Sequence, residues 1–95
     1  MAAADKSASA VAVELPPALV RLFPGSLQRV EVGASSVGEA IDALNARWPG
    51  MRDRLVDSTP RIRRNINVFV EGERASLATR LAPGAAVTIR IAMIG

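Results

Sequence analysis

The chain has 95 residues, 49% of them hydrophobic and 22% charged, and its 12 basic and 9 acidic side chains give a formal net charge of +3. This length supports a single domain with one modest core. The sequence contains no cysteine and no histidine, which excludes a thiol nucleophile, a disulfide framework, a zinc finger and every catalytic triad built on histidine.

Residues 1–10 are small or polar and lack the continuous apolar stretch of a signal peptide. We expect them to form a disordered lead-in to one domain over residues 11–95. No segment approaches the roughly 20 apolar residues of a membrane span, so we expect a cytoplasmic protein without membrane partners.

Two short runs near the N-terminus are typical of strands. Apolar residues alternate with others from Val11 to Leu15, and Pro16-Pro17 ends this run. Residues 18–23 are too few for a substantial helix. A second alternating run over residues 29–32 predicts a strand that pairs with the first as a hairpin, joined by a longer loop than a tight turn.

The segment after the hairpin carries the clearest helical pattern. Ser36 and Glu39 have the spacing of a capping box, in which the serine oxygen caps the first helical N–H groups and the glutamate reaches back. Pro49-Gly50 ends the helix. Apolar residues recur at helical spacing on one face, which we expect to be core: Val37, Ala40, Ile41, Leu44 and Trp48.

Further strands and one helical turn are predicted in the second half. Residues 51–56 fit one extra helical turn. Residues 66–70 alternate as a strand and lead into a turn at Glu71-Gly72, and a weaker strand is expected around Ala75. The last strand alternates from Val87 onwards and is expected to run almost to the end of the chain.

The resulting order is β-β-α-β-(β)-β. It predicts an α+β fold in which a mixed sheet of four or five strands packs on one main helix. The helix is the crossover between the hairpin and the third strand. The first and last strands are expected to lie side by side and parallel, as in a β-grasp domain.

Few side chains in this sequence are candidates for chemistry. No cluster of metal ligands occurs, so we expect no metal site. Glu71 and Glu73 flank a turn glycine and fit a solvated hairpin turn. Arg61, Arg63 and Arg64 form the densest basic run, which is either a solvated loop or a patch for an acidic partner. Nucleic-acid binding is not expected, because acidic residues are scattered among the basic ones and no aromatic platform is evident.

The C-terminal end is apolar and uncharged, whereas most soluble chains end in polar residues. A terminal α-carboxylate is ionised at neutral pH, with a reference pKa of about 3.3–3.7, and it becomes a good electrophile once ATP adenylates it. Gly95 would let such a carboxylate pass through a narrow channel, because glycine has no Cβ.

Several segments together resemble the MoaD/ThiS family of ubiquitin-like sulfur carriers, over roughly residues 11–95. Their order and spacing carry the resemblance more than any single segment does. The segments are Leu15-Pro16 to Gly25, Ser36 to Ala40 with Leu44, Trp48 to Leu55, Asn65 to Glu73, Pro83-Gly84 before Val87-Thr88-Ile89, and Ala92-Met93-Ile94-Gly95.

The resemblance implies a β-grasp domain that binds no cofactor and carries sulfur as a thiocarboxylate on Gly95. An adenylating protein related to ubiquitin-activating enzymes would activate the carboxylate with ATP and Mg²⁺. A sulfur-accepting synthase would then use the sulfur to build molybdopterin, thiamine or cysteine. The tail that enters these partners would comprise Ala92, Met93 and Ile94, and the docking residues beside it would be Phe69 and Arg90.

By the same resemblance the chain would be a protein substrate rather than an enzyme, or the small subunit of a molybdopterin-synthase-like enzyme. The sequence departs from the family at its end, because the family ends in Gly-Gly and here the penultimate residue is Ile94. Gly95 then aligns with the first glycine of the pair, and the second is missing. Three explanations remain open: a last residue missing from the sequence, a carrier that uses a single glycine, or a β-grasp interaction module that has lost the carrier tail.

Overall fold

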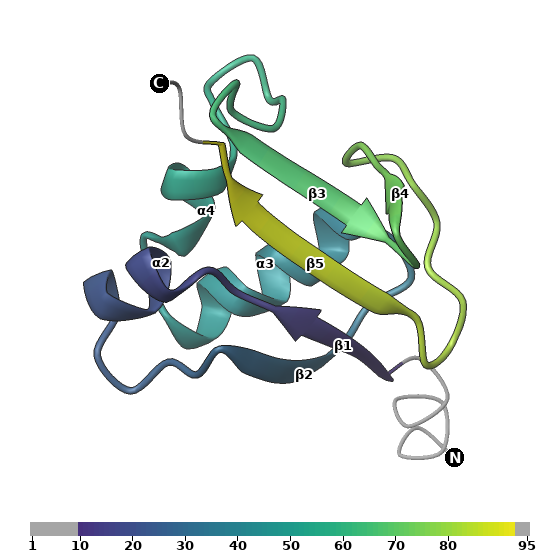
Figure 1. Ribbon diagram of the computed structural model, residues 1–95, viewed down its shortest axis with the longest axis horizontal. Helices are drawn as coiled ribbons and strands as arrows, with labels where there is room; N and C mark the ends of the chain where they lie inside the picture. The colour runs from purple at the N-terminus through teal and green to yellow at the C-terminus, as the bar shows by residue number, and fades with distance from the viewer. Residues whose placement is uncertain (1–9, 93–95) are drawn as a thin grey trace.

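The computed structural model describes residues 10–92, which form a five-stranded sheet with three helices (Figure 1). Residues 1–9, most of the expected lead-in, lie outside the described residues. The elements in chain order are β1 (Ala10–Glu14), α2 (Pro17–Leu22), β2 (Arg29–Gly33), α3 (Val37–Arg47), α4 (Met51–Leu55), β3 (Ile66–Val70), β4 (Glu73–Arg74) and β5 (Ala86–Ile91).

The sheet is mixed, with the strand order β2-β1-β5-β3-β4. The neighbouring strands β1 and β5 are parallel, and the other three pairs are antiparallel. This confirms the predicted β-grasp arrangement, with α3 as the main crossover helix. Because β5 lies between β1 and β3, the last strand of the chain is the central strand of the sheet.

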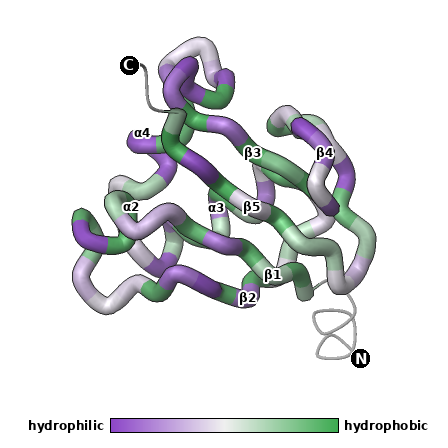
Figure 2. The backbone as a smooth tube through the Cα atoms, in the orientation of Figure 1, coloured by the Kyte–Doolittle hydropathy of each residue, from purple (hydrophilic) through white to green (hydrophobic). Residues whose placement is uncertain are grey.

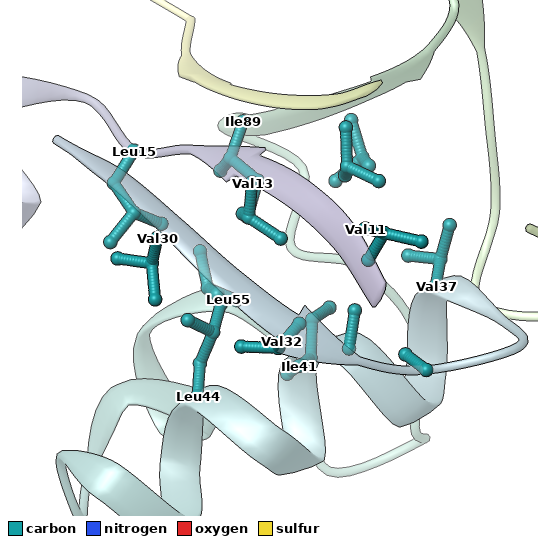
Figure 3. Close-up of a cluster of buried hydrophobic side chains, with 14 of the residues drawn as sticks. Val11, Val13, Leu15, Val30, Val32, Val37, Ile41, Leu44, Leu55 and Ile89 are labelled. Carbon is teal, nitrogen blue, oxygen red and sulfur yellow. The ribbon is translucent and has the colours of Figure 1, made fainter. Parts of the chain in front are cut away.

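The core lies between α3 and one face of the sheet. Side chains alternate across a strand, so every second residue of β1, β2, β3 and β5 faces the helix, and Figure 2 shows the matching changes of hydropathy along the backbone of β2 and β5. Leu44 of α3 and Leu55 of α4 are fully buried against this face (Figure 3). The predicted apolar face of the helix is therefore core, except that Trp48 is only partly buried.

The start of α3 has the predicted cap with one change of partner. The hydroxyl oxygen of Ser36 accepts a hydrogen bond from the backbone N–H of Glu39 at 3.2 Å. The Glu39 carboxylate reaches back one residue further than in a capping box and accepts from the N–H and hydroxyl of Ser35, at 2.8 and 2.7 Å. These hydrogen bonds, the backbone one first, lower the pKa of Glu39 below its ordinary value of 4.5.

The structure corrects the expectation that residues 18–23 form no substantial helix, because α2 spans Pro17–Leu22. Proline is favoured in the first helical turn, where its fixed φ suits the helix and its missing N–H has no intrahelical role. Leu19 is buried in the core. Six residues are too short to be stable alone, so this tertiary contact holds the helix.

Several strand boundaries differ from the prediction, most of them by one residue. β1 begins one residue early, at Ala10, which pairs with Gly33. β4 lies just before Ala75, although the Ala75 N–H still donates to a β3 carbonyl. β5 ends at Ile91, which pairs with the first residue of β3, and one further hydrogen bond joins the N–H of Ala92 to the carbonyl of Asn65. The predicted continuation over residues 93–95 lies outside the described residues.

The helices described in residues 10–92 are all too short or too polar to cross a membrane.

Candidate functional site

The end of β5 positions the segment that was predicted to carry the chemistry. The last strand pair joins Ile91 to Ile66, and the N–H of Ala92 then donates to the carbonyl of Asn65 at 2.7 Å. Ala92 is half-buried. The chain therefore leaves the sheet from a fixed point at the end of its central strand.

The other predicted tail residues, Met93, Ile94 and Gly95, lie outside the described residues. Their roles remain a prediction from the sequence.

The loop that supplies Asn65 is organised by the carboxylate of Asp57. Its Oδ1 accepts hydrogen bonds from the N–H of Thr59 at 2.9 Å, from the Thr59 hydroxyl at 2.5 Å and from the N–H of Arg61 at 3.0 Å. The Thr59 hydroxyl, followed by these backbone groups, holds the pKa of Asp57 below its ordinary value of 3.8. A charged Asp57 thus stabilises the loop between α4 and β3.

An open groove of about 770 Å³ lies beside the end of β5, between that strand and the helices α2 and α4. Figure 1 shows α4 close to the point where the chain leaves the sheet. The side chain of Leu22 is 52% exposed at this groove, so part of its apolar lining faces solvent. The apolar lining residues are Leu22, Phe23, Ile66 and Ile91, and the charged ones are Asp53, Arg54 and Arg63.

The outer face of the sheet, opposite α3, carries both predicted docking residues. Phe69 pairs with Thr88 and Arg90 pairs with Asn67, so the two lie diagonally across β3 and β5 on one face. Phe69 is half-buried and Arg90 is exposed. The guanidinium carbon of Arg74 lies 5.9 Å from the centre of the Phe69 ring, a cation–π contact that covers part of the ring.

The acidic pair at the β3–β4 turn has a structural role that the sequence did not reveal. Glu71 has a positive φ of 50°, and its Oε2 accepts a hydrogen bond from the N–H of Ala86 at 2.7 Å. This contact ties the turn to the start of β5. In residues 10–92, no three acidic side chains come close enough to hold a metal ion.

Sequence reasoning missed two components of the site. Asn65 holds Ala92 through its backbone carbonyl, a role open to any residue type and therefore without a sequence signal. Arg54 and Arg63 meet at one groove although one belongs to α4 and the other to the following loop. The only sequence signal for this groove was the basic run of Arg61, Arg63 and Arg64.

The comparisons with known proteins agree with this geometry, although no family model matches the chain. The sulfur carrier protein CysO of Mycobacterium tuberculosis is 33% identical over 85 residues, which span 83% of this chain and 91% of that protein. A chain of the Amycolatopsis orientalis BexX/CysO complex has a TM-score of 0.78 at 31% identity, over 90% of this chain and 98% of its own length.

A third similar structure is SAMP1 from Haloferax volcanii, with a TM-score of 0.76 and 27% identity over 90% of this chain and 98% of that one. These likenesses extend over nearly the whole length of each protein. The TM-scores of 0.78 and 0.76 show that the two solved structures have the same overall fold as this chain. The chain therefore belongs to the MoaD/ThiS-like family of ubiquitin-like sulfur carrier proteins.

Proposed function

We propose that this chain carries sulfur as a thiocarboxylate on Gly95 and donates it to cysteine biosynthesis. The carboxylate oxygen attacks the α-phosphorus of ATP and releases pyrophosphate, in a reaction run with Mg²⁺ by an adenylating protein related to ubiquitin-activating enzymes. A sulfur donor then attacks the acyl-adenylate and expels AMP. On a sulfur-accepting synthase the thiocarboxylate sulfur attacks an electrophilic carbon of the acceptor and displaces its leaving group. Water then hydrolyses the resulting thioester, which releases the sulfur-bearing product and regenerates the carboxylate.

The observation that carries this proposal is the 33% identity to the sulfur carrier CysO across most of both chains. The fold supports it, because Ala92 is held at the end of the central strand and the proposed tail follows directly after it. The chain itself supplies no general acid or base through histidine or cysteine. We infer that catalysis belongs to the partner enzymes and that this chain is their protein substrate.

We further propose that the outer sheet face docks on these partners, with Phe69 and Arg90 as contacts and Ala92, Met93 and Ile94 as the inserted tail. The Amycolatopsis orientalis structure is a complex of CysO with BexX, so a protein of this fold is known to bind a second protein. A stable complex with the synthase would make this chain its small subunit, in the manner of a molybdopterin synthase.

The test is an intact mass of the protein isolated from its own cells, together with a map of its C-terminal peptide. Replacement of one oxygen by sulfur in that peptide is expected. Methionine oxidation gives a nearly equal mass change, so the modified species is also treated with a thiol-alkylating reagent. Because the chain has no cysteine, only a thiocarboxylate reacts.

The peptide map also shows whether sulfur is on Gly95 or on a glycine beyond it. As a control, one residue is added after the last residue found by the peptide map. The carboxylate of that last residue then becomes part of a peptide bond, which is expected to abolish sulfur incorporation. A plain carboxylate in the presence of the adenylating protein, ATP and a sulfur donor would instead support an interaction module without a covalent cycle.

The docking face is tested with Phe69→Ser. We expect weaker binding to the adenylating protein, because the substitution removes the largest apolar side chain on the outer face. Val20→Ser, at a partly buried apolar position on α2 away from that face, is the control. Equal binding of both variants to the adenylating protein would show that the outer face is not the docking surface.

A further inference from the structure

Three arginines gather where the chain leaves the sheet. Arg54 on α4 and Arg63 line the groove beside Ile91. Arg64 immediately precedes Asn65, whose carbonyl holds Ala92, and it lines an adjacent smaller groove together with Arg63. We call Arg54, Arg63 and Arg64 the arginine rim.

No arginine of the rim forms an ion pair inside the described part of the chain, although Arg63 lies close enough to Asp57 to help lower the pKa of that carboxylate. Over residues 10–92 the single ion pair joins Arg52 to Asp42, at 2.8 Å between Nη1 and Oδ1. Asp53 is the only acidic residue among those 83 positions that lines either groove. It meets the rim through its backbone, since its carbonyl accepts a hydrogen bond from Arg63 Nε at 2.7 Å. The three positive charges of the rim therefore outnumber the two carboxylates near them, Asp53 in the groove and Asp57 in the adjoining loop.

The position of the rim brings it against any enzyme that acts on Gly95. Gly95 lies three residues beyond Ala92, and three extended residues span at most about 10 Å. An active site that holds Gly95 must therefore bring the surrounding enzyme surface to within about that distance of the fixed point. Arginine side chains beside the fixed point lie at the mouth of the channel that admits the tail.

We propose that the arginine rim binds an acidic protein surface around the tail channel of the adenylating partner. This inference rests on the proposed carrier function and adds the chemistry of the partner. A guanidinium forms paired hydrogen bonds with a carboxylate. Complementary charges at such a mouth speed association and orient the tail before it enters.

The surroundings of the rim favour a protein over a nucleic acid. The groove has an apolar lining that includes Leu22 and Ile91, which suits apolar side chains of a protein surface. Binding of single strands without base readout needs aromatic rings on which successive bases stack. The ring of Phe69 lies on the outer sheet face rather than in the groove, and Arg74 covers part of it.

The test compares association rates of two double variants with the adenylating protein of the same organism. Arg54→Gln/Arg64→Gln removes two rim charges, while Arg63 is kept because its hydrogen bond to Asp53 is structural. Arg47→Gln/Arg80→Gln is the matched control. It removes the same net charge at two exposed positions that line neither groove.

At low ionic strength the rim variant is expected to associate about tenfold more slowly than the unaltered chain, and the control within about twofold. Added salt is expected to slow the unaltered chain more than the rim variant. Equal slowing of both variants would assign the effect to net charge alone, and unchanged association of the rim variant would also overturn the proposal.

Two parallel measurements separate this proposal from its alternatives. Thiocarboxylation of the unaltered chain tests the carrier function, so a chain that binds through the rim but acquires no sulfur refutes only the carrier function. A single-stranded oligothymidine is titrated as a second probe. In one outcome the rim variant loses a salt-dependent binding of this probe and yet associates with the adenylating protein as fast as the unaltered chain. That result would show that the rim binds nucleic acid and not an acidic protein surface.

Discussion

Gly50 joins α3 to α4 with a φ of +99°, in the left-handed region that residues with a Cβ avoid. A Cβ at this position would lie 3.5 Å from Phe23 Cε1, an ordinary contact, so backbone strain rather than crowding disfavours a side chain. Glycine here sets the direction of α4 and thereby the placement of Arg54 beside the end of β5.

We predict that Gly50→Ala lowers the free energy of unfolding by about 1–2 kcal/mol. Gly33→Ala is the control, because Gly33 lacks a positive φ and a methyl group there would meet nothing within 4 Å. The control is expected to change stability by less than about 0.5 kcal/mol. Urea unfolding measures both, and equal losses would contradict the assignment to backbone strain.

Asp57 predicts a specific pH dependence of stability. Hydrogen bonds from Thr59 and Arg61 lower its pKa in the folded state. Its contribution is therefore complete above the unfolded pKa and is lost as the pH falls through the lower folded pKa. We expect Asp57→Asn to be less stable than the unaltered chain at about pH 6, with the difference closing towards about pH 2.5.

Urea unfolding at several pH values measures the Asp57 effect. Asp53→Asn is the matched control, since it removes one carboxylate that accepts no hydrogen bond from the loop. A difference between the Asp57 variant and the unaltered chain that stays constant down to the lowest pH would show that the charge of Asp57 does not stabilise the loop.

At the scale of elements, α4 depends on its connection to α3. The helix has five residues, too few for independent stability. Met51 and Leu55 are buried on one side of it. At its start, Oδ1 of Asn45 accepts hydrogen bonds from the N–H groups of Gly50 and Arg52, at 3.0 and 3.1 Å. Asn45 thus satisfies backbone donors that a helix start leaves without partners.

We predict that Asn45→Ala lowers the free energy of unfolding by about 2 kcal/mol, because it leaves two partly buried N–H groups without an acceptor. Asn45→Asp keeps an acceptor oxygen, and its negative charge is favourable at the start of α4 but unfavourable in the last turn of α3, so the effects of the two helix dipoles oppose each other. It should lose less than half as much in urea unfolding. Equal losses for both variants would show that the acceptor is not what matters.

At the scale of the whole molecule, the sheet order determines which strands open together. β5 is hydrogen-bonded on both sides, to β1 and β3, whereas β2 has a partner only in β1 within the described sheet. Exchange of amide hydrogens in a central strand requires opening of the whole sheet, while an edge can open locally. The proposed carrier tail therefore follows directly after the strand that opens least.

We predict that the amides of β5 exchange on the order of 100-fold more slowly than those of β2 that point away from β1. Hydrogen exchange followed by NMR at single residues measures this, and the Ala92 N–H should share the protection of β5 because it donates to Asn65. Equal protection along β2 would indicate that its free edge is covered by another molecule in solution.

The elements predicted from the sequence are those whose signals lie within a few residues. Alternation from Val11 to Leu15 and the cap formed by Ser36 and Glu39 identified β1 and α3, and their order predicted the β-grasp fold. The helix α2 was missed, because its six residues carry too little periodic signal and a buried contact of Leu19 stabilises it.

By itself the sequence determined the core face of each strand, the main helix, the family resemblance and the candidate role of Gly95. Hydropathy repeats are local, so they can be seen without the fold. Only the tertiary structure decided that Asn65 holds Ala92 and that Arg54 meets Arg63 beside it. The first contact joins segments far apart in the chain through the register of β3 against β5, which no local pattern encodes. The second depends on the path of the loop after α4, where Arg63 Nε donates to the carbonyl of Asp53.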